Sequence, residues 1–124
     1  MSFTGSNIYF QDTETRIVSI SFFDASTNKA NIVSIQDFDV DDPTRMTGRI
    51  DAQKLSYDSL SAKWIALNGV ERSFTNERQS ASFFVSLTVS NLNFKQIDLT
   101  KKQQKLQEMN LDELTELKIG RAHV

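Results

Sequence analysis

The chain of 124 residues has no cysteine, one proline and four glycines, and its single histidine is the penultimate residue, His123. Without cysteine there is no disulfide scaffold and no Cys-ligated zinc site. With no other histidine, a Ser- or Cys-based triad lacks its usual base. We therefore expect a domain that is not an enzyme, with no catalytic residue, no metal site and no cofactor.

The charge and hydropathy of the chain exclude further classes. The formal net charge is −2 and no basic run is dense enough for a nucleic-acid footprint. No stretch approaches the roughly 20 apolar residues of a membrane-spanning helix. The first eleven residues lack the basic start and apolar run of a signal peptide. Apolar residues make up 39% of the sequence, which is enough for the core of one domain.

Four acids surround the only proline, Pro43, in a predicted loop: Asp37, Asp39, Asp41 and Asp42. Carboxylates of this kind can bind calcium, but the glycine and the final glutamate of an EF-hand are missing. We expect a solvated acidic loop, with a weak cation site as the alternative.

Alternating apolar and polar residues, joined by polar turns, occupy residues 8–98. Because no helical periodicity lies between them, they predict six to eight antiparallel strands and not a parallel sheet. The predicted fold is mainly β: an antiparallel sheet folded on itself, a small sandwich or a jelly roll. The side chains expected on its inner face are Val18, Ile20, Phe22, Ile50, Ala52, Phe83, Val85, Leu87 and Val89.

Two strands are predicted to be irregular. In "RIDAQKLSYD" the apolar positions change from even to odd numbers, which predicts a β-bulge near Gln53 or Lys54. In "WIALNGV", either the even-numbered or the odd-numbered residues of 64–67 can face the core, and the sequence leaves this open.

The character of the chain changes after Asp98. Residues 99–109 are polar and predict a linker, and "NLDELTELK" at 110–118 predicts a helix. Asn110 can cap that helix and Glu113 completes a capping box. Leucines three positions apart give it an apolar stripe.

The two ends of the chain are not expected to belong to the folded domain. Residues 1–7 are small and polar and predict a disordered or truncated start. The last six residues, "IGRAHV" at 119–124, are what a common sequencing adapter encodes, and the adapter continues with a stop codon. We therefore expect residues 119–124 to be an artefact and the natural protein to continue.

An apolar inner face needs no catalytic group to bind a lipid. Each CH₂ of an acyl chain buried there contributes about 0.8 kcal/mol. The open edges of such a sheet can also add strands from a neighbouring domain.

Several short motifs follow one another in a recognisable order. Their positions are Val33, Ile35, Phe38, Asp39, Ile50, Ala52, Leu55, Tyr57, Asp58, Trp64, Ala66, Val70, Phe74, 96–99 and 109–114. Together they resemble the periplasmic domain of the LptF/LptG (YjgP/YjgQ) family of lipopolysaccharide-export permeases, over roughly residues 8–117. Gln96, where proline is common in the family, and the long "KKQQK" linker depart from the pattern, and the linker resembles the Bacteroidetes branch.

The resemblance implies a β-jelly-roll domain at residues 8–98, related to the LptA/OstA-like folded sheets, in the periplasm of a Gram-negative bacterium. Its C-terminal helix would lead toward the inner membrane. The implied partners are the acyl chains of lipopolysaccharide, a paralogous permease subunit, a separate ATPase subunit and the jelly-roll domains of a periplasmic bridge. The nine inward residues above would then line a lipid groove.

Two alternatives remain open from the sequence. One is a soluble periplasmic lipid carrier or bridge domain with the same fold. The other is a structural or adhesion β-module whose core is sealed against lipid.

Overall fold

The computed structural model describes residues 7–76, 78–106 and 108. Six antiparallel strands form one sheet in the order of the chain. A helix follows at residues 96–106, and among the described residues no helix is long and apolar enough to cross a membrane. The prediction of a mainly β, folded antiparallel sheet with a C-terminal helix is confirmed. The strands are β1 (Ile8–Thr13), β2 (Arg16–Asp24), β3 (Lys29–Phe38), β4 (Met46–Asp58), β5 (Lys63–Thr75) and β6 (Arg78–Val89).

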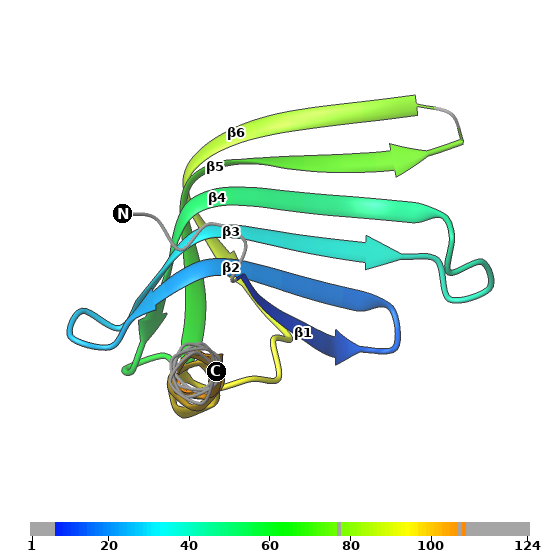
Figure 1. Cartoon of the computed structure of the whole chain (residues 1–124). Helices are drawn as coiled ribbons and strands as arrows, with labels where there is room; N and C mark the ends of the chain where they lie inside the picture. The colour runs from blue at the N-terminus through cyan, green and yellow to red at the C-terminus, as the bar shows by residue number, and fades with distance from the viewer. Residues whose placement is uncertain (1–6, 77, 107, 109–124) are drawn as a thin grey trace, which may run out of the picture.

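The strands bend together, so that the sheet folds over on itself. Figure 1 shows β4 and β5 running along the upper limb and then turning steeply down toward the helix, which is seen end-on. The longest strands have 13 residues and would span about 43 Å if straight, at about 3.3 Å per residue. The bend brings both halves of these strands around one small core.

The bend coincides with a row of residues at which the pairing is interrupted. The ladder is continuous on either side of this row, which is made up of Ser21, Ile32, Gln53, Asn68 and Val85. Two of its members, Ile32 and Asn68, have positive φ angles of 53° and 55°. The irregularity predicted near Gln53 or Lys54 is therefore present at Gln53. It is a break shared by β2–β6, and not an extra residue in one strand.

The interrupted row changes which side chains point inward. The buried residues that flank the break are Ile20 and Phe23 on β2, and Ala52 and Leu55 on β4, three positions apart in each case. A strand without a break would place every second residue on the same face. Both limbs of the sheet therefore point apolar side chains into one interior. The buried core consists of Ile8, Phe10, Val18, Ile20, Phe23, Ala30, Val33, Ile35, Ala52, Leu55, Trp64, Ala66, Val89, Phe94 and Leu99.

Gly69 lies next to the interrupted row, where two strands approach closely. A Cβ atom at Gly69 would overlap the Asp51 carbonyl oxygen and lie 2.9 Å from Cα of Ala52. It would also lie 2.8 Å from the ring of Phe84, the residue that pairs with Gly69 on β6. A glycine inside a strand commonly marks such a close approach of backbone to backbone.

We predict that Gly69→Ala destabilises the domain by about 1–3 kcal/mol, since neither backbone neighbour can move without breaking the ladder. Gly48→Ala is the matched control, because its Cβ would lie 3.6 Å from the Arg72 carbonyl oxygen, at ordinary contact distance. Urea unfolding of the two variants and the parent chain measures the difference. Equal stability of the two variants would contradict the close approach at Gly69.

Candidate functional site

The candidate site is the interior of the folded sheet, and the structure brings six of the nine predicted residues to it. Val18, Ile20, Ala52 and Val89 are buried in the core, and Ile50 and Leu87 are partly buried against it. Phe22, Phe83 and Val85 are on the outside, with exposed fractions of 48%, 87% and 77%. As lipid contacts, all nine remain predictions.

The three misplaced residues have one physical cause. The strict alternation from Phe83 to Val89 runs across the interrupted row at Val85, so the residues before the row face the opposite way to those after it. Phe84 therefore packs against the core in place of Phe83. On β2, the break at Ser21 has the same effect, and the adjacent Phe23 is buried where Phe22 was predicted.

The sequence left open which residues of 64–67 on β5 face the core, and the structure shows that the even-numbered ones do. Trp64 and Ala66 are buried, whereas Ile65 and Leu67 are only partly buried on the other face. The indole nitrogen of Trp64 donates a buried hydrogen bond of 3.2 Å to the Phe94 carbonyl oxygen. A buried tryptophan usually satisfies its N–H group in this way.

Aromatic side chains from distant parts of the chain meet at the centre of this interior. The ring of Phe94 stacks on Phe10 with 4.8 Å between centroids, and lies 5.3 Å from the ring of Trp64. Tyr57 meets Trp64 edge-on at 5.1 Å. Sequence reasoning missed Phe94 and Leu99 as core residues. Phe94 was placed in the predicted β domain but not on its inner face, and Leu99 begins the segment that was expected to be a polar linker.

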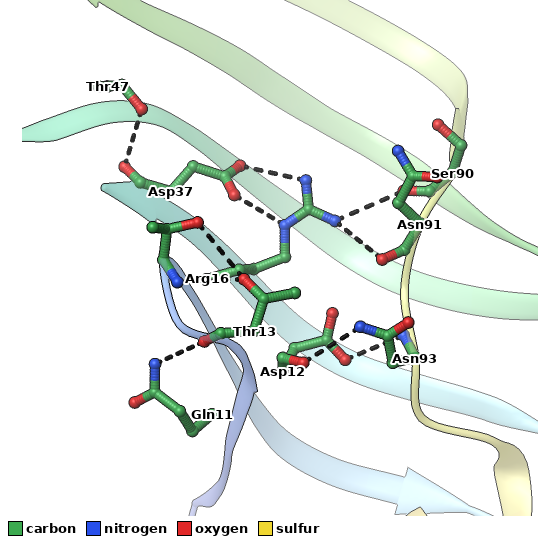
Figure 2. A network of polar contacts seen from close by, with 10 residues as sticks. Gln11, Asp12, Thr13, Arg16, Asp37, Thr47, Ser90, Asn91 and Asn93 are labelled. Carbon is green, nitrogen blue, oxygen red and sulfur yellow. Dashed lines mark hydrogen bonds and ion pairs between the residues drawn. The ribbon is translucent and has the colours of Figure 1, made fainter. Parts of the chain in front are cut away.

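A polar network ties the segment after β6 to the start of the sheet (Figure 2). The Arg16 side chain donates from Nε to Asp37 Oδ1 at 2.7 Å, and reaches the Ser90 and Asn91 carbonyl oxygens at 3.4 Å. Beside it, both the backbone and the side-chain nitrogen of Asn93 donate to Asp12, at 2.9 and 3.1 Å. Residues 90–93 thus cross from β6 to β1.

The helix covers the edge of β2 beyond the end of β1. The Gln103 side chain accepts from the Phe23 amide at 2.7 Å and donates to the Phe23 carbonyl oxygen at 2.6 Å. These are the backbone groups that a neighbouring strand would otherwise bind. Lys102 lies over the Phe10 ring, 4.7 Å from its centroid, and donates to the Tyr9 carbonyl oxygen at 3.3 Å.

The helix begins earlier than the sequence predicted. Asp98 makes half of a capping box, because its Oδ2 accepts from the Lys95 amide at 2.8 Å, and the Asp98 amide donates to the Lys95 carbonyl oxygen at 3.0 Å. Most of the expected linker at 99–109 is therefore helical. The helix predicted at 110–118 and the artefact predicted at 119–124 lie outside the described residues.

Of the four acids predicted to lie in a loop, Asp37 is instead at the end of β3, where it pairs with Arg16 on β2. The other three lie in the loop, where Asp39 accepts from the Asp41 amide at 2.8 Å. Hydrogen bonds from the hydroxyl and then the amide of Thr44 hold the pKa of Asp42 below its usual range. Within 7–76, 78–106 and 108, no cluster of three or more His, Cys, Asp or Glu side chains could hold a metal ion.

Comparison with known proteins identifies the family. The family model for the lipopolysaccharide export system permease LptF/LptG matches residues 1–122. No curated protein matches the chain. The family resemblance drawn from the motifs is thereby confirmed, whereas the Bacteroidetes branch remains a prediction. LptF/LptG permeases are inner-membrane transporter components, so the family's role is transport. The chain, with its folded antiparallel sheet, belongs to the LptF/LptG family of lipopolysaccharide export permeases.

Proposed function

We propose that this chain is the periplasmic domain of its permease and that it passes lipopolysaccharide along the inner face of the folded sheet to a periplasmic bridge. The observation that carries the proposal is one apolar interior shared by all six strands, from Ile8 on β1 to Val89 on β6. Family membership indicates that the lipid is lipopolysaccharide, because these permeases export it.

The inner face suits an amphipathic ligand. Ile50 on β4 pairs with Glu71 on β5, and Glu71 pairs with Ser82 on β6. Because directly paired residues share a face of the sheet, these two polar side chains lie on the inner face next to the apolar core. The ion pair of Arg16 and Asp37 lies farther along the same face. An acyl chain would bind in the apolar part, while a sugar or phosphate group would meet the polar end.

This function requires no chemistry from the domain itself. An acyl chain gains about 0.8 kcal/mol for each buried CH₂, which is enough to bind it without a charged anchor. Energy for directional movement would come from the separate ATPase subunit that works with a pair of permeases. The domain would then act as a passive part of the path.

The sheet has one edge suited to a neighbouring jelly-roll domain. Within the part of the chain that the structure describes, strand β6 pairs only with β5, and residues 79–89 contain neither a charge nor a proline. Proteins usually place such residues on exposed edges to prevent strand addition. The β1 side is different, since Asn93 and Lys102 bind to it. We therefore assign the contact with the bridge to β6.

Adjacent phenylalanines on opposite faces of β6 allow a matched test of the lipid path. A photoreactive benzoylphenylalanine at Phe84 should form adducts with lipopolysaccharide, because Phe84 packs toward the interior. The same group at Phe83, which is 87% exposed on the outer face, should form few. Gel mobility after irradiation with purified lipopolysaccharide measures both yields.

Equal yields at the two positions, or a higher yield at Phe83, would contradict transport along the inner face. No adduct at either position would instead favour a core that is sealed against lipid.

The contact through β6 predicts a different variant. Val85→Lys places a charge on the exposed edge strand and should weaken binding to a bridge jelly-roll domain roughly tenfold, as edge lysines oppose strand addition. Ile32→Lys is the control, because Ile32 belongs to the same interrupted row but lies on β3, inside the sheet. Biolayer interferometry measures both affinities. Similar affinities for the two variants would place the contact elsewhere.

A further inference from the structure

The interior that would hold an acyl chain is partly filled by the chain's own C-terminal part. Residues 90–106, here called the lid segment, place Phe94 and Leu99 in the core with exposed fractions of 6% and 0%. Leu92 and Leu106 pack against the same core. These apolar side chains occupy the space between the sheet and the helix, where a lipid tail would find the same environment.

The lid segment can leave without breaking the sheet. The six strands pair only with one another, so no rung of the ladder depends on residues 90–106. Its polar attachments at the rim are the contacts of Gln103 with Phe23, Asn93 with Asp12 and Lys102 with the Tyr9 carbonyl oxygen. One buried attachment is added, the hydrogen bond from the Trp64 indole to the Phe94 carbonyl oxygen, and this bond must break when the segment leaves. The contacts of Arg16 with residues 90 and 91 are long, at 3.4 Å.

The seam between the lid segment and β1 is imperfectly closed. The Oδ2 atom of Asp12 is buried there without a hydrogen-bond partner, which is a costly arrangement that opening the seam to water would relieve. A hollow of about 390 Å³ lies along the same seam. Its lining includes Phe10 and Phe94, the two acids Asp12 and Asp98, and the two lysines Lys101 and Lys102.

We propose that the lid segment is an internal occupant of the acyl-chain site, and that a lipid acyl chain enters at the β1 seam by displacing Phe94 and Leu99. This inference rests on the proposed function. The stacked rings of Phe10 and Phe94 give the entering chain an apolar surface. Lys101 and Lys102 line the same hollow and supply the cations that would face an anionic headgroup, while the carboxylates of Asp12 and Asp98 in that lining accept from the amides of Asn93 and Lys95.

Two observations indicate that Gln103 makes the main polar attachment of the helix to the sheet. Its side-chain amide makes two short hydrogen bonds with the backbone of Phe23, and both lie in a partly buried environment. They are made to backbone groups at the edge of β2, so they hold the helix against the sheet without using the side-chain packing of the core. Gln103→Ala should therefore release the lid segment while leaving the strands paired.

Trp64, the only tryptophan, reports on the lid segment directly. It contacts the Phe94 ring and donates to the Phe94 carbonyl oxygen, so displacement of Phe94 exposes the indole and shifts its emission to the red. The matched control is Gln104→Ala, since Gln104 is the neighbouring glutamine and is exposed.

The test uses the 124-residue chain and a dansyl-labelled fatty acid as the probe. Gln103→Ala should bind the probe about tenfold more tightly than Gln104→Ala, the effect of about one net hydrogen bond lost from the closed state, and should show a red-shifted Trp64 emission. A double variant, Asp12→Cys with Asn93→Cys, can lock the seam, because the chain has no other cysteine. Oxidised, it should bind no probe, and reduction should restore binding.

Equal probe affinity and equal emission in the two glutamine variants would overturn the inference. Probe binding by the oxidised double variant would overturn it too, and this second test decides the matter if Gln103→Ala fails to fold. Failure of the proposed function looks different. In that case the lid variants behave as expected, but phosphatidylglycerol displaces the probe and lipopolysaccharide does not.

Discussion

The shape of this domain depends on one constraint, the interruption of the hydrogen-bonded ladder along a single row of the sheet. Five strands share the break, at Ser21, Ile32, Gln53, Asn68 and Val85. If only one strand were irregular, its neighbours would resist the bend, because each is bonded to the next along its length. With all five interrupted together, the sheet folds sharply, and its two limbs enclose one apolar interior (Figure 1).

The same break explains how the chain closes that interior. The fold carries the end of β6 to the far side of the sheet, so residues 90–93 reach Asp12 and Arg16, more than 70 positions away in the sequence. Phe94 and Leu99 are then placed in the core, and Gln103 binds the exposed edge of β2. The interior is therefore closed by side chains of residues 90–106, which are not part of the ladder, whereas the sheet around it is held by the ladder itself. Because the two sets of contacts are separate, the interior can open without the sheet unfolding.

Local patterns in the sequence were sufficient to predict antiparallel strands in a folded sheet, since the alternating runs are joined by short polar turns with no helical pattern between them. They did not predict the order of the strands. The parity change in "RIDAQKLSYD" even located the break on β4. What local patterns could not show is that the break crosses the whole sheet. Phe83 and Phe84, or Phe22 and Phe23, are chemically the same, and only the backbone at the break decides which faces the core. The burial of Phe94 was not predictable for a related reason, because its partners Phe10 and Trp64 are brought to it by the fold.

The central claim is that lipid acyl chains contact the inner face of the bent sheet. Nuclear Overhauser effects between methyl-labelled Ile, Leu and Val residues and the acyl protons of bound lipopolysaccharide measure this most directly. The account predicts effects at Ile20, Leu87 and Val89, on the inner face of both limbs. Effects confined to Ile32, Val70 and Val85, on the outer face, would contradict it.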